Sequence, residues 1–226
     1  MAIKQKHCYD YPHPAVTTDI ALFTIRQQAL SVLLIQRGNQ PYQGMWALPG
    51  GFLDIDEDIE TCAKRELMEE TGIAGVYLEQ LYTFGTPQRD PRERVISVTY
   101  FALSQSDSLS PKAASDAALA EWFPINELPE LAFDHSEIIQ LARQRLLSKL
   151  SYSTIAFQML PHHFTLSQLQ SVYETLLNAD LDKRNFRKGI LARKIIEETG
   201  DYCRSGNHRP AKTYQLINPS RVEIIK

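Results

Sequence analysis

The sequence is poor in cysteine and has no long apolar segment. Its three cysteines, Cys8, Cys62 and Cys203, have neither the spacing of a zinc motif nor that of a disulfide framework. No apolar run approaches the ~18 residues that a membrane-spanning helix needs. The first residues, MAIKQKHCYDYPHP, lack the apolar stretch of a secretory signal peptide. We therefore expect a cytoplasmic protein with reduced thiols and no membrane partner.

The composition is that of an ordinary globular protein, with 43% hydrophobic and 23% charged residues among 226. The net charge of −3 is distributed unevenly. Residues 1–150 contain 13 basic and 20 acidic residues, whereas residues 151–226 contain 11 basic and 7 acidic ones. This asymmetry indicates two modules with different partners, although charge also fluctuates along a single domain.

The first 150 residues alternate between strand-like and helical patterns. β-Branched and apolar runs predict strands at 16–25, 31–37, 76–84, 94–103 and near 122–123, the first two forming a hairpin. Apolar residues at three- and four-residue spacing predict a helix that begins at Asp56 and ends at Gly72. A second amphipathic helix is predicted over 134–150. Mixed strands with a central and a closing helix indicate an α/β sandwich over residues 1–150.

Residues 151–226 show a different pattern. TLSQLQSVYETLL predicts a helix capped by Thr165, and RNFRKGILARKIIEETG predicts a second, basic helix closed by Gly200. YCRSGNHRPAKTYQLI then predicts two short strands around a Gly-Asn turn. Helix, turn, basic helix and basic hairpin is the order of a winged helix, so we expect a DNA-binding domain here.

Three glutamates carry the strongest chemical signal. Glu66, Glu69 and Glu70 share one face of the first predicted helix, because positions i, i+3 and i+4 are neighbours on a helix. Like charges at this spacing repel unless a cation lies between them. Carboxylates are ligands that Mg²⁺ prefers, together with water and phosphate oxygens. The alternative for three glutamates alone is a solvated acidic face.

The surrounding residues favour the metal interpretation. Residues 51–73, GFLDIDEDIETCAKRELMEETGI, fill every fixed position of the pattern G-x5-E-x7-R-E-U-x-E-E-x-G-U, in which U is aliphatic. The fixed positions are Gly51, Glu57, Arg65, Glu66, Leu67, Glu69, Glu70, Gly72 and Ile73. Over about residues 14–150 the chain thus resembles the Nudix hydrolase superfamily, whose members cleave nucleoside diphosphates linked to another group.

The resemblance implies a fold and site roles. It implies an α/β/α sandwich in which Glu66, Glu69, Glu70 and the carbonyl of Gly50 hold Mg²⁺ or Mn²⁺, while Arg65 positions Glu66. Water then attacks phosphorus, and a carboxylate acts as base. Glu66 is one candidate base. Because the base of many relatives lies outside the motif, Asp116 is a second candidate and Glu121 its alternative, although a surface acid is the plainer interpretation of Asp116.

Four arginines are expected near the phosphates. They are Arg37 at the end of the second strand and Arg89, Arg92 and Arg94 in the run RDPRER. The segments 83–103 and 131–139 resemble those of ADP-ribose-type Nudix proteins, so ADP-ribose is the leading ligand. Trp46, Tyr82 and Phe84 are possible stacking partners for adenine, although buried aromatic residues more often fill a core.

Basic residues of the second module are the candidate DNA contacts. They are Arg184, Asn185, Arg187 and Lys188 on the second helix, with Arg209 and Lys212 on the hairpin. The alternative is a solvated basic surface on a small dimerisation domain.

A Nudix domain followed by a winged helix resembles the Nudix-related transcriptional regulators of NAD and sugar metabolism. That resemblance implies a homodimer on double-stranded DNA whose Nudix domain senses ADP-ribose or a related ligand. Two hypotheses follow: an ADP-ribose pyrophosphatase fused to a winged helix, or a ligand-responsive regulator whose Nudix domain turns over slowly or not at all. The intact motif favours the first, and the basic C-terminal module favours the second.

Overall fold

The first part of the chain folds around a mixed β-sheet. A computed structural model describes residues 9–105, 117–204 and 210–225. Within them, a seven-stranded sheet is formed by β1 (Ala15–Arg26), β2 (Ala29–Arg37), β3 (Trp46–Ala47), β4 (Gly50–Phe52), β5 (Tyr77–Phe84), β6 (Val95–Leu103) and β7 (Ala117–Pro124). The β1–β6 pair is parallel, and the other pairs are antiparallel.

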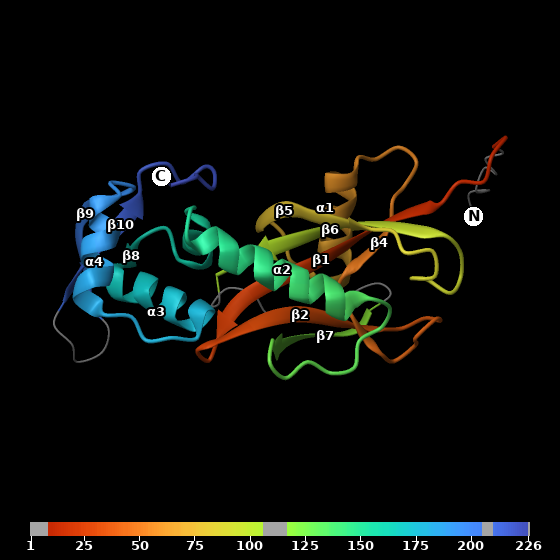
Figure 1. The fold of residues 1–226 in the computed structure, drawn as a ribbon, viewed down its shortest axis with the longest axis horizontal. Helices are drawn as coiled ribbons and strands as arrows, with labels where there is room; N and C mark the ends of the chain where they lie inside the picture. Colours follow the sequence, from red (N-terminus) through yellow and green to blue (C-terminus); the bar gives the residue numbers. More distant parts are fainter. Residues whose placement is uncertain (1–8, 106–116, 205–209, 226) are drawn as a thin grey trace.

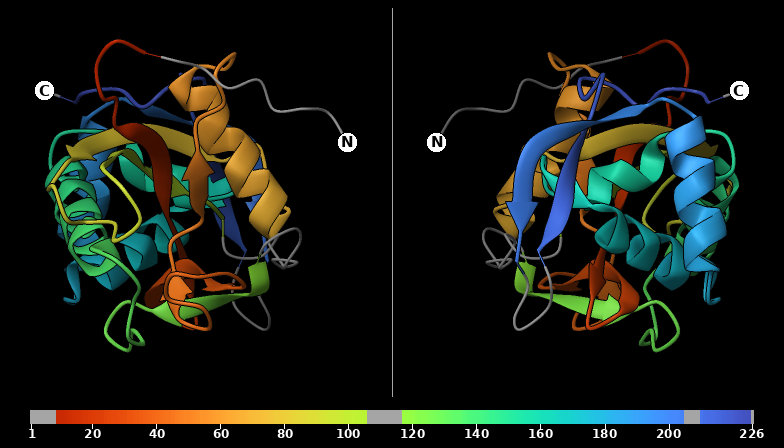
Figure 2. Two further views of the ribbon diagram at one scale, coloured as in Figure 1. Left: turned by 90° about the vertical axis from the view of Figure 1, so that its right-hand side faces the viewer. Right: turned by 90° about the vertical axis from the view of Figure 1, so that its left-hand side faces the viewer.

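Two helices cover opposite faces of this sheet (Figure 2). They are α1 (Ile59–Thr71) and α2 (His135–Leu150). The alternation of side chains along β1 produces this arrangement. Ile20 belongs to the apolar cluster that contains Leu67 of α1, while the next residue, Ala21, belongs to the cluster that contains Ile138 of α2. The predicted α/β sandwich is therefore confirmed.

The predicted hairpin between the first two strands is also confirmed. β1 pairs with β2 from Phe23↔Val32 to Arg26↔Ala29. Gln27 and Gln28 form the turn with φ angles of 49° and 61°. Two residues with positive φ match the right-handed twist of the flanking strands.

The last third of the chain forms a second, smaller unit at the opposite end of the molecule from the N-terminus (Figure 1). It contains a 3₁₀ helix η1 (Ile155–Met159), β8 (Phe164–Thr165), α3 (Leu166–Leu177), α4 (Lys183–Ala192), β9 (Ile196–Cys203) and β10 (Ala211–Leu216). The three strands pair in the order β8-β10-β9. As predicted, Thr165 caps α3, and Gln168 completes a capping box with it.

One hydrophobic core joins the two units. The cluster that begins under the sheet with Phe101 continues through Leu146 of α2 and Phe157 of η1. It then includes Leu169 of α3 and Ile190 of α4. Figure 1 shows α2 running alongside the sheet toward α3 and α4. The winged-helix unit is therefore packed against the sandwich and not tethered by an exposed linker.

Two predicted helix boundaries were wrong. The cap of α1 is Asp58, not Asp56, because the Asp58 carboxylate accepts the backbone N–H groups of Glu60 and Thr61, each at 3.0 Å.

The basic helix, which is the second helix predicted for residues 151–226, does not continue to Gly200. It ends at Ala192, and Lys194 follows with φ 53°. Residues 196–203 form β9 instead, in antiparallel pairing with β10. Ile196 buries its side chain in the shared core in this arrangement, so long-range pairing overrides the helical pattern of the local sequence.

None of the helices in the described ranges combines the length and the apolar character needed to cross a bilayer.

Candidate functional site

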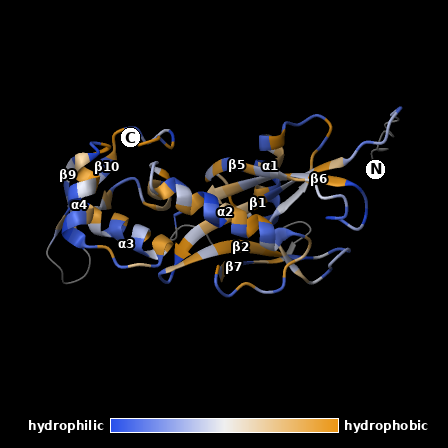
Figure 3. Ribbon diagram, in the orientation of Figure 1, coloured by the Kyte–Doolittle hydropathy of each residue, from blue (hydrophilic) through white to orange (hydrophobic). Residues whose placement is uncertain are grey.

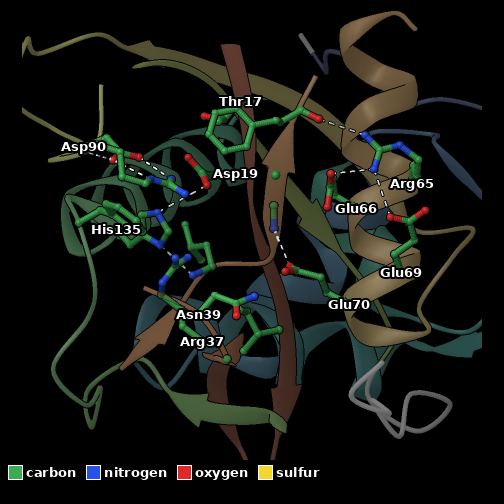
Figure 4. A pocket seen from close by; sticks show the side chains of 18 of the residues that line it. Thr17, Asp19, Arg37, Asn39, Arg65, Glu66, Glu69, Glu70, Asp90 and His135 are labelled. Carbon is green, nitrogen blue, oxygen red and sulfur yellow. Dashed lines mark hydrogen bonds and ion pairs between the residues drawn. The ribbon is translucent and has the colours of Figure 1, made fainter. Parts of the chain in front are cut away.

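A pocket of about 440 Å³ opens between α1 and the N-terminal end of α2. Figure 4 shows Glu66, Glu69 and Glu70 on one side of the pocket and Arg37, Asp90 and His135 on the other. Glu66, Glu69 and Glu70 of α1 form one wall, and Arg37 and Arg92 belong to the lining of the other. The pocket therefore has an acidic and a basic side.

α1 presents its carboxylates to the pocket because its other face is buried. Cys62, Ala63 and Leu67 are at most 2% exposed, and Ala63 and Leu67 pack against the sheet. The glutamates lie three and four residues apart on the remaining surface, as the sequence predicts. The predicted end of the helix at Gly72 is confirmed, with φ 70° and a backbone N–H that donates to the carbonyl of Met68 at 2.9 Å.

Arg65 holds several carboxylates together. Its guanidinium donates to Glu57 Oε1 at 2.5 Å, to Glu66 Oε1 at 2.7 Å and to Glu69 Oε2 at 3.2 Å. It also donates to the carbonyl of Phe52 at 3.2 Å. The hydrogen bonds from Arg65 lower the pKa of Glu57 to about 2. Arg65 is thus placed to orient Glu66, which is the role that the sequence implied for it.

Glu70 is a buried carboxyl group, and Glu66 is half-buried. Burial raises the pKa of Glu66 despite its contact with Arg65. Burial also raises the pKa of Glu70 to about 8, although the N–H of Gly50 donates to Glu70 Oε2 at 2.9 Å. Neighbouring negative charges add to both shifts. A cation at this wall would stabilise the ionised forms.

Two glycines allow the close packing of this wall. Gly50 has φ 156°, and a Cβ there would lie 2.0 Å from the carbonyl oxygen of Thr18. A Cβ on Gly51 would lie 2.4 Å from the carboxyl carbon of Glu66. Side chains at these positions would displace β4 from β1 or Glu66 from its place.

The donor set suits a hard divalent cation. It consists of the carboxylate oxygens of the exposed Glu69, the half-buried Glu66 and the buried Glu70, beside the backbone of Gly50. In the part of the chain that the structure describes, no three acidic, His or Cys side chains already surround a single point. Glu66 and Glu69 are in contact with Arg65, and Glu70 is in contact with Gly50. The chemistry of the donors therefore fits the metal.

The four predicted arginines have different positions. Arg37, Arg89 and Arg92 line the pocket, whereas Arg94 is not among its lining residues. Arg94 instead donates to the carbonyl of Val95 at 3.4 Å. Arg92 pairs with Asp90, with Nη2 2.7 Å from Oδ2.

Arg89 is paired with two aspartates. Its side chain is 4% exposed, and it donates to Asp134 Oδ2 at 2.9 Å and to Asp134 Oδ1 at 2.6 Å. Its Nη2 also lies 3.4 Å from Asp19 Oδ2. These bonds tie the loop before β6 to the start of α2. The geometry therefore points to a positioning role for Arg89 rather than a free phosphate contact.

His135 completes this buried network as a neutral ring. Its Nδ1 accepts the N–H of Leu48 at 2.9 Å, and its Nε2 faces Asp19 Oδ1 at 3.5 Å. The hydroxyl of Ser97 donates to Asp19 Oδ2 at 2.5 Å. Burial lowers the pKa of His135, while the charges of Asp19 and Asp134 oppose the shift.

The remaining candidates lie away from the pocket or outside the described residues. Asp116 lies outside the described residues, and Glu121 is an exposed residue of β7 that is not part of the lining. The suggested aromatic partners do not line the pocket either: Trp46 packs on Phe123 with ring centroids 4.7 Å apart, and Tyr82 packs on Phe84 at 5.6 Å.

Sequence reasoning missed Asp19, Phe52 and Phe133 as lining residues. Asp19 is a single carboxylate inside the apolar strand VTTDIALFTI, which was a visible signal. Phe133 lies in the segment 131–139 that resembles ADP-ribose-type proteins, and Phe52 lies in the Nudix motif, but neither was singled out as a lining residue.

The candidate DNA contacts lie on α4 and β10. Arg184, Asn185, Arg187 and Lys188 are exposed on α4, whose N-cap Asp182 accepts the N–H of Asn185 at 2.8 Å. Figure 3 shows this helix as largely hydrophilic. Only Ile190 of α4 is fully buried.

The hairpin contributes less free charge than the sequence suggested. Lys212 is exposed but forms an ion pair with Glu198, with Nζ 2.8 Å from Oε2. Arg209 lies outside the described residues. The unpaired basic surface that the structure describes is therefore concentrated on α4.

Both parts of the chain match known families. Residues 13–142 match the NUDIX domain, and residues 156–216 match the NrtR DNA-binding winged helix domain. The chain is 39% identical over 211 residues to the ADPR responsive transcriptional repressor NtrR of Acinetobacter baylyi, which covers 92% of this chain and 84% of that protein.

Two further comparisons bear on the same question. The ADP-ribose pyrophosphatase of Methanocaldococcus jannaschii is 42% identical over 130 residues, covering 58% of this chain and 73% of that enzyme. The crystal structure of Shewanella oneidensis NrtR complexed with a 27mer DNA superposes with a TM-score of 0.78 at 38% identity, covering 89% of this chain and 93% of that chain. The repressor and the DNA complex match nearly the whole chain, whereas the pyrophosphatase matches little more than half of it.

Proposed function

Because this chain belongs to the Nudix family and carries the NrtR type of winged-helix domain, we propose that it is an ADP-ribose-responsive, DNA-binding transcriptional regulator. The observation that carries the proposal is a single apolar core that joins a pocket with opposed charges to an exposed basic helix. The similarity to the Acinetobacter baylyi repressor along 92% of the chain supports it.

The pocket suits a nucleoside diphosphate derivative such as ADP-ribose. Arg37 and Arg92 supply guanidinium groups that recognise phosphate oxygens. On the opposite wall, Glu66, Glu69, Glu70 and the carbonyl of Gly50 would hold Mg²⁺ or Mn²⁺. When bound, the cation neutralises phosphate charge and lowers the pKa of a water ligand. A diphosphate between these walls would contact positive charge on both sides.

A second candidate function is hydrolysis of the same ligand. The complete Nudix motif and the 42% identity to an ADP-ribose pyrophosphatase favour it. In this reading Arg65 orients Glu66, and the Glu66 carboxylate accepts a proton from the attacking water. Asp116 stays a prediction for an additional ligand or base.

The basic face of α4 is the proposed DNA-contacting surface. Its cations would contact phosphates and base edges as the recognition helix of a winged helix does. Arg184, Asn185, Arg187 and Lys188 are assigned to this contact, with Arg209 and Lys212 of the hairpin as secondary contacts. We propose a homodimer, because two copies of the helix would match two half-sites of an operator.

Fluorescence anisotropy tests the regulator directly. Randomised 27-base-pair duplexes are enriched on the full-length protein, and the best duplex is labelled and titrated with and without ADP-ribose. We expect ADP-ribose to change the affinity for DNA about tenfold, which corresponds to about 1.4 kcal/mol of coupling. If no duplex binds more tightly than a scrambled one, the regulator proposal is wrong.

Variants test which surface binds DNA and which binds ADP-ribose. R187E/K188E should abolish DNA binding and leave ADP-ribose binding unchanged, because α4 lies on the winged-helix unit and none of its residues lines the pocket. The matched control K64E changes the charge of an exposed helix residue on the Nudix unit and should leave DNA binding unchanged.

A product assay with Mg²⁺ and ADP-ribose tests hydrolysis. If wild type releases AMP and ribose 5-phosphate, Glu70→Gln should lose that activity while keeping its fold. Turnover by Glu70→Gln at the wild-type rate would exclude Glu70 from the metal site.

A further inference from the structure

Phe133 adopts an unusual backbone conformation at the edge of the pocket. Its φ angle is 54°, in the left-handed region that residues other than glycine and asparagine rarely enter. Tyr42 has a φ of 62°, and the two rings contact edge to face with centroids 4.8 Å apart. Two aromatic residues from distant loops are thus held against each other in strained conformations, which are typical of ligand-binding sites.

The ring of Phe133 lies beside two guanidinium groups. The Cζ of Arg37 lies 4.8 Å from its centroid, and the Cζ of Arg92 lies 5.9 Å from it. The negative face of an aromatic ring attracts a cation at such distances. The same ring therefore lies beside both arginines that face the acidic wall, and Arg92 also lies 5.2 Å from the Phe52 centroid.

These two arginines need such support because they repel each other. Burial lowers the pKa of Arg37, and the charge of Arg92 lowers it further. Arg37 forms no ion pair within the described ranges, and its Nε donates to the carbonyl of Pro41 at 2.9 Å. Arg92 is anchored by Asp90. The Arg37 guanidinium is thus a half-buried positive charge that forms no ion pair in the described ranges. It is attracted by the charges of Glu70, Asp90 and Asp19, and it lies over an aromatic ring.

We propose that Phe133 is a positioning residue that holds Arg37 and Arg92 side by side for the diphosphate of the ligand. The Phe133 ring contacts Tyr42 from one loop and lies beside Arg92 from another. The inference rests on the proposed function, since it assumes that the pocket binds a nucleoside diphosphate.

Titration calorimetry with two probes tests this role. ADP-ribose and inorganic pyrophosphate are titrated into the full-length protein without divalent metal, so that no turnover occurs. Phe133→Leu keeps apolar bulk but removes the ring face, and Phe133→Tyr keeps the ring. Phe84→Leu is the matched control, because Phe84 is a partly buried aromatic residue that does not line the pocket.

We expect Phe133→Leu to bind both probes about three- to tenfold more weakly, as loss of a cation–π contact predicts. Phe133→Tyr should restore the affinity, and Phe84→Leu should not change it. Melting temperatures identify variants that are not folded. If Phe133→Leu does not fold, Phe133→Asn replaces it, because asparagine tolerates positive φ and lacks a ring.

Three results would overturn the inference in distinguishable ways. Wild-type affinity of Phe133→Leu for both probes would show that the ring only fills space. A loss limited to ADP-ribose would show that the ring stacks on the nucleoside and does not act through the arginines. If wild type binds neither probe, with or without Mg²⁺, the proposed function fails and the inference fails with it.

Discussion

The buried ion pairs of Arg89 make a quantitative prediction about stability. The Arg89 side chain is 4% exposed and donates twice to Asp134, while its Nη2 lies 3.4 Å from an oxygen of Asp19. Arg89→Met keeps the apolar stem but leaves the buried Asp19 and the half-buried Asp134 without their cation. Removing one partner of a buried ion pair costs about 3–5 kcal/mol. For a chain of this size, that loss lowers the melting temperature by roughly 6–20 °C.

Urea unfolding of Arg89→Met and wild type measures this difference. The control is Lys64→Met, because Lys64 and Glu60 form an exposed i,i+4 pair with side chains 62% and 59% exposed. Such pairs contribute about 0.3–0.5 kcal/mol. An additional Asp134→Asn substitution in the Arg89→Met background should recover part of the loss, because it removes one of the two unpaired charges. If Arg89→Met destabilises the protein no more than Lys64→Met does in these titrations, the reasoning is refuted.

Three further predictions follow from single contacts. Burial lowers the pKa of His135, so the unfolded chain binds a proton there at a higher pH than the folded protein does. The free energy of unfolding should therefore fall as pH drops below about 6.5. In urea titrations at pH 7 and 5.5, His135→Gln should reduce this dependence of stability on pH. Gly51→Ala should abolish metal-dependent turnover and weaken the binding of Mn²⁺ without large unfolding, because the new methyl group would displace the flexible Glu66 carboxyl. Unchanged Mn²⁺ affinity by calorimetry would contradict this prediction. Gly189→Ala should raise the free energy of unfolding, measured by urea titration, by about 0.5–1 kcal/mol, because nothing occupies the space where the Cβ of this helical residue would lie. A lower stability would show that the added methyl group clashes.

The sequence allowed prediction of the acidic wall because its residues are close together in the chain. Glu66, Glu69 and Glu70 lie on one helix, so helical spacing alone brings them together. The hairpin of β1 and β2 was predictable for the same reason. Asp58 was less predictable as a cap, since the segment DIDED offers three aspartates at the start of the helix.

The basic wall could not be assembled from local patterns. Arg37, Arg92 and Phe133 come from three separate segments, which meet only after the sheet forms and α2 packs on it. The sequence also could not show that Arg89 is paired with Asp134, 45 residues away. The predicted end of α4 at Gly200 was wrong for a similar reason, because β9 exists only through its pairing with β10.

The continuous core that runs from the sheet through α2 into α4 has a consequence for stability measurements. Two units that share buried side chains should unfold in one cooperative transition rather than in two. A ligand that binds only the folded protein stabilises everything that unfolds with its site. ADP-ribose in the pocket should therefore protect the backbone amides of α4 from hydrogen exchange, although no atom of the ligand would be near them.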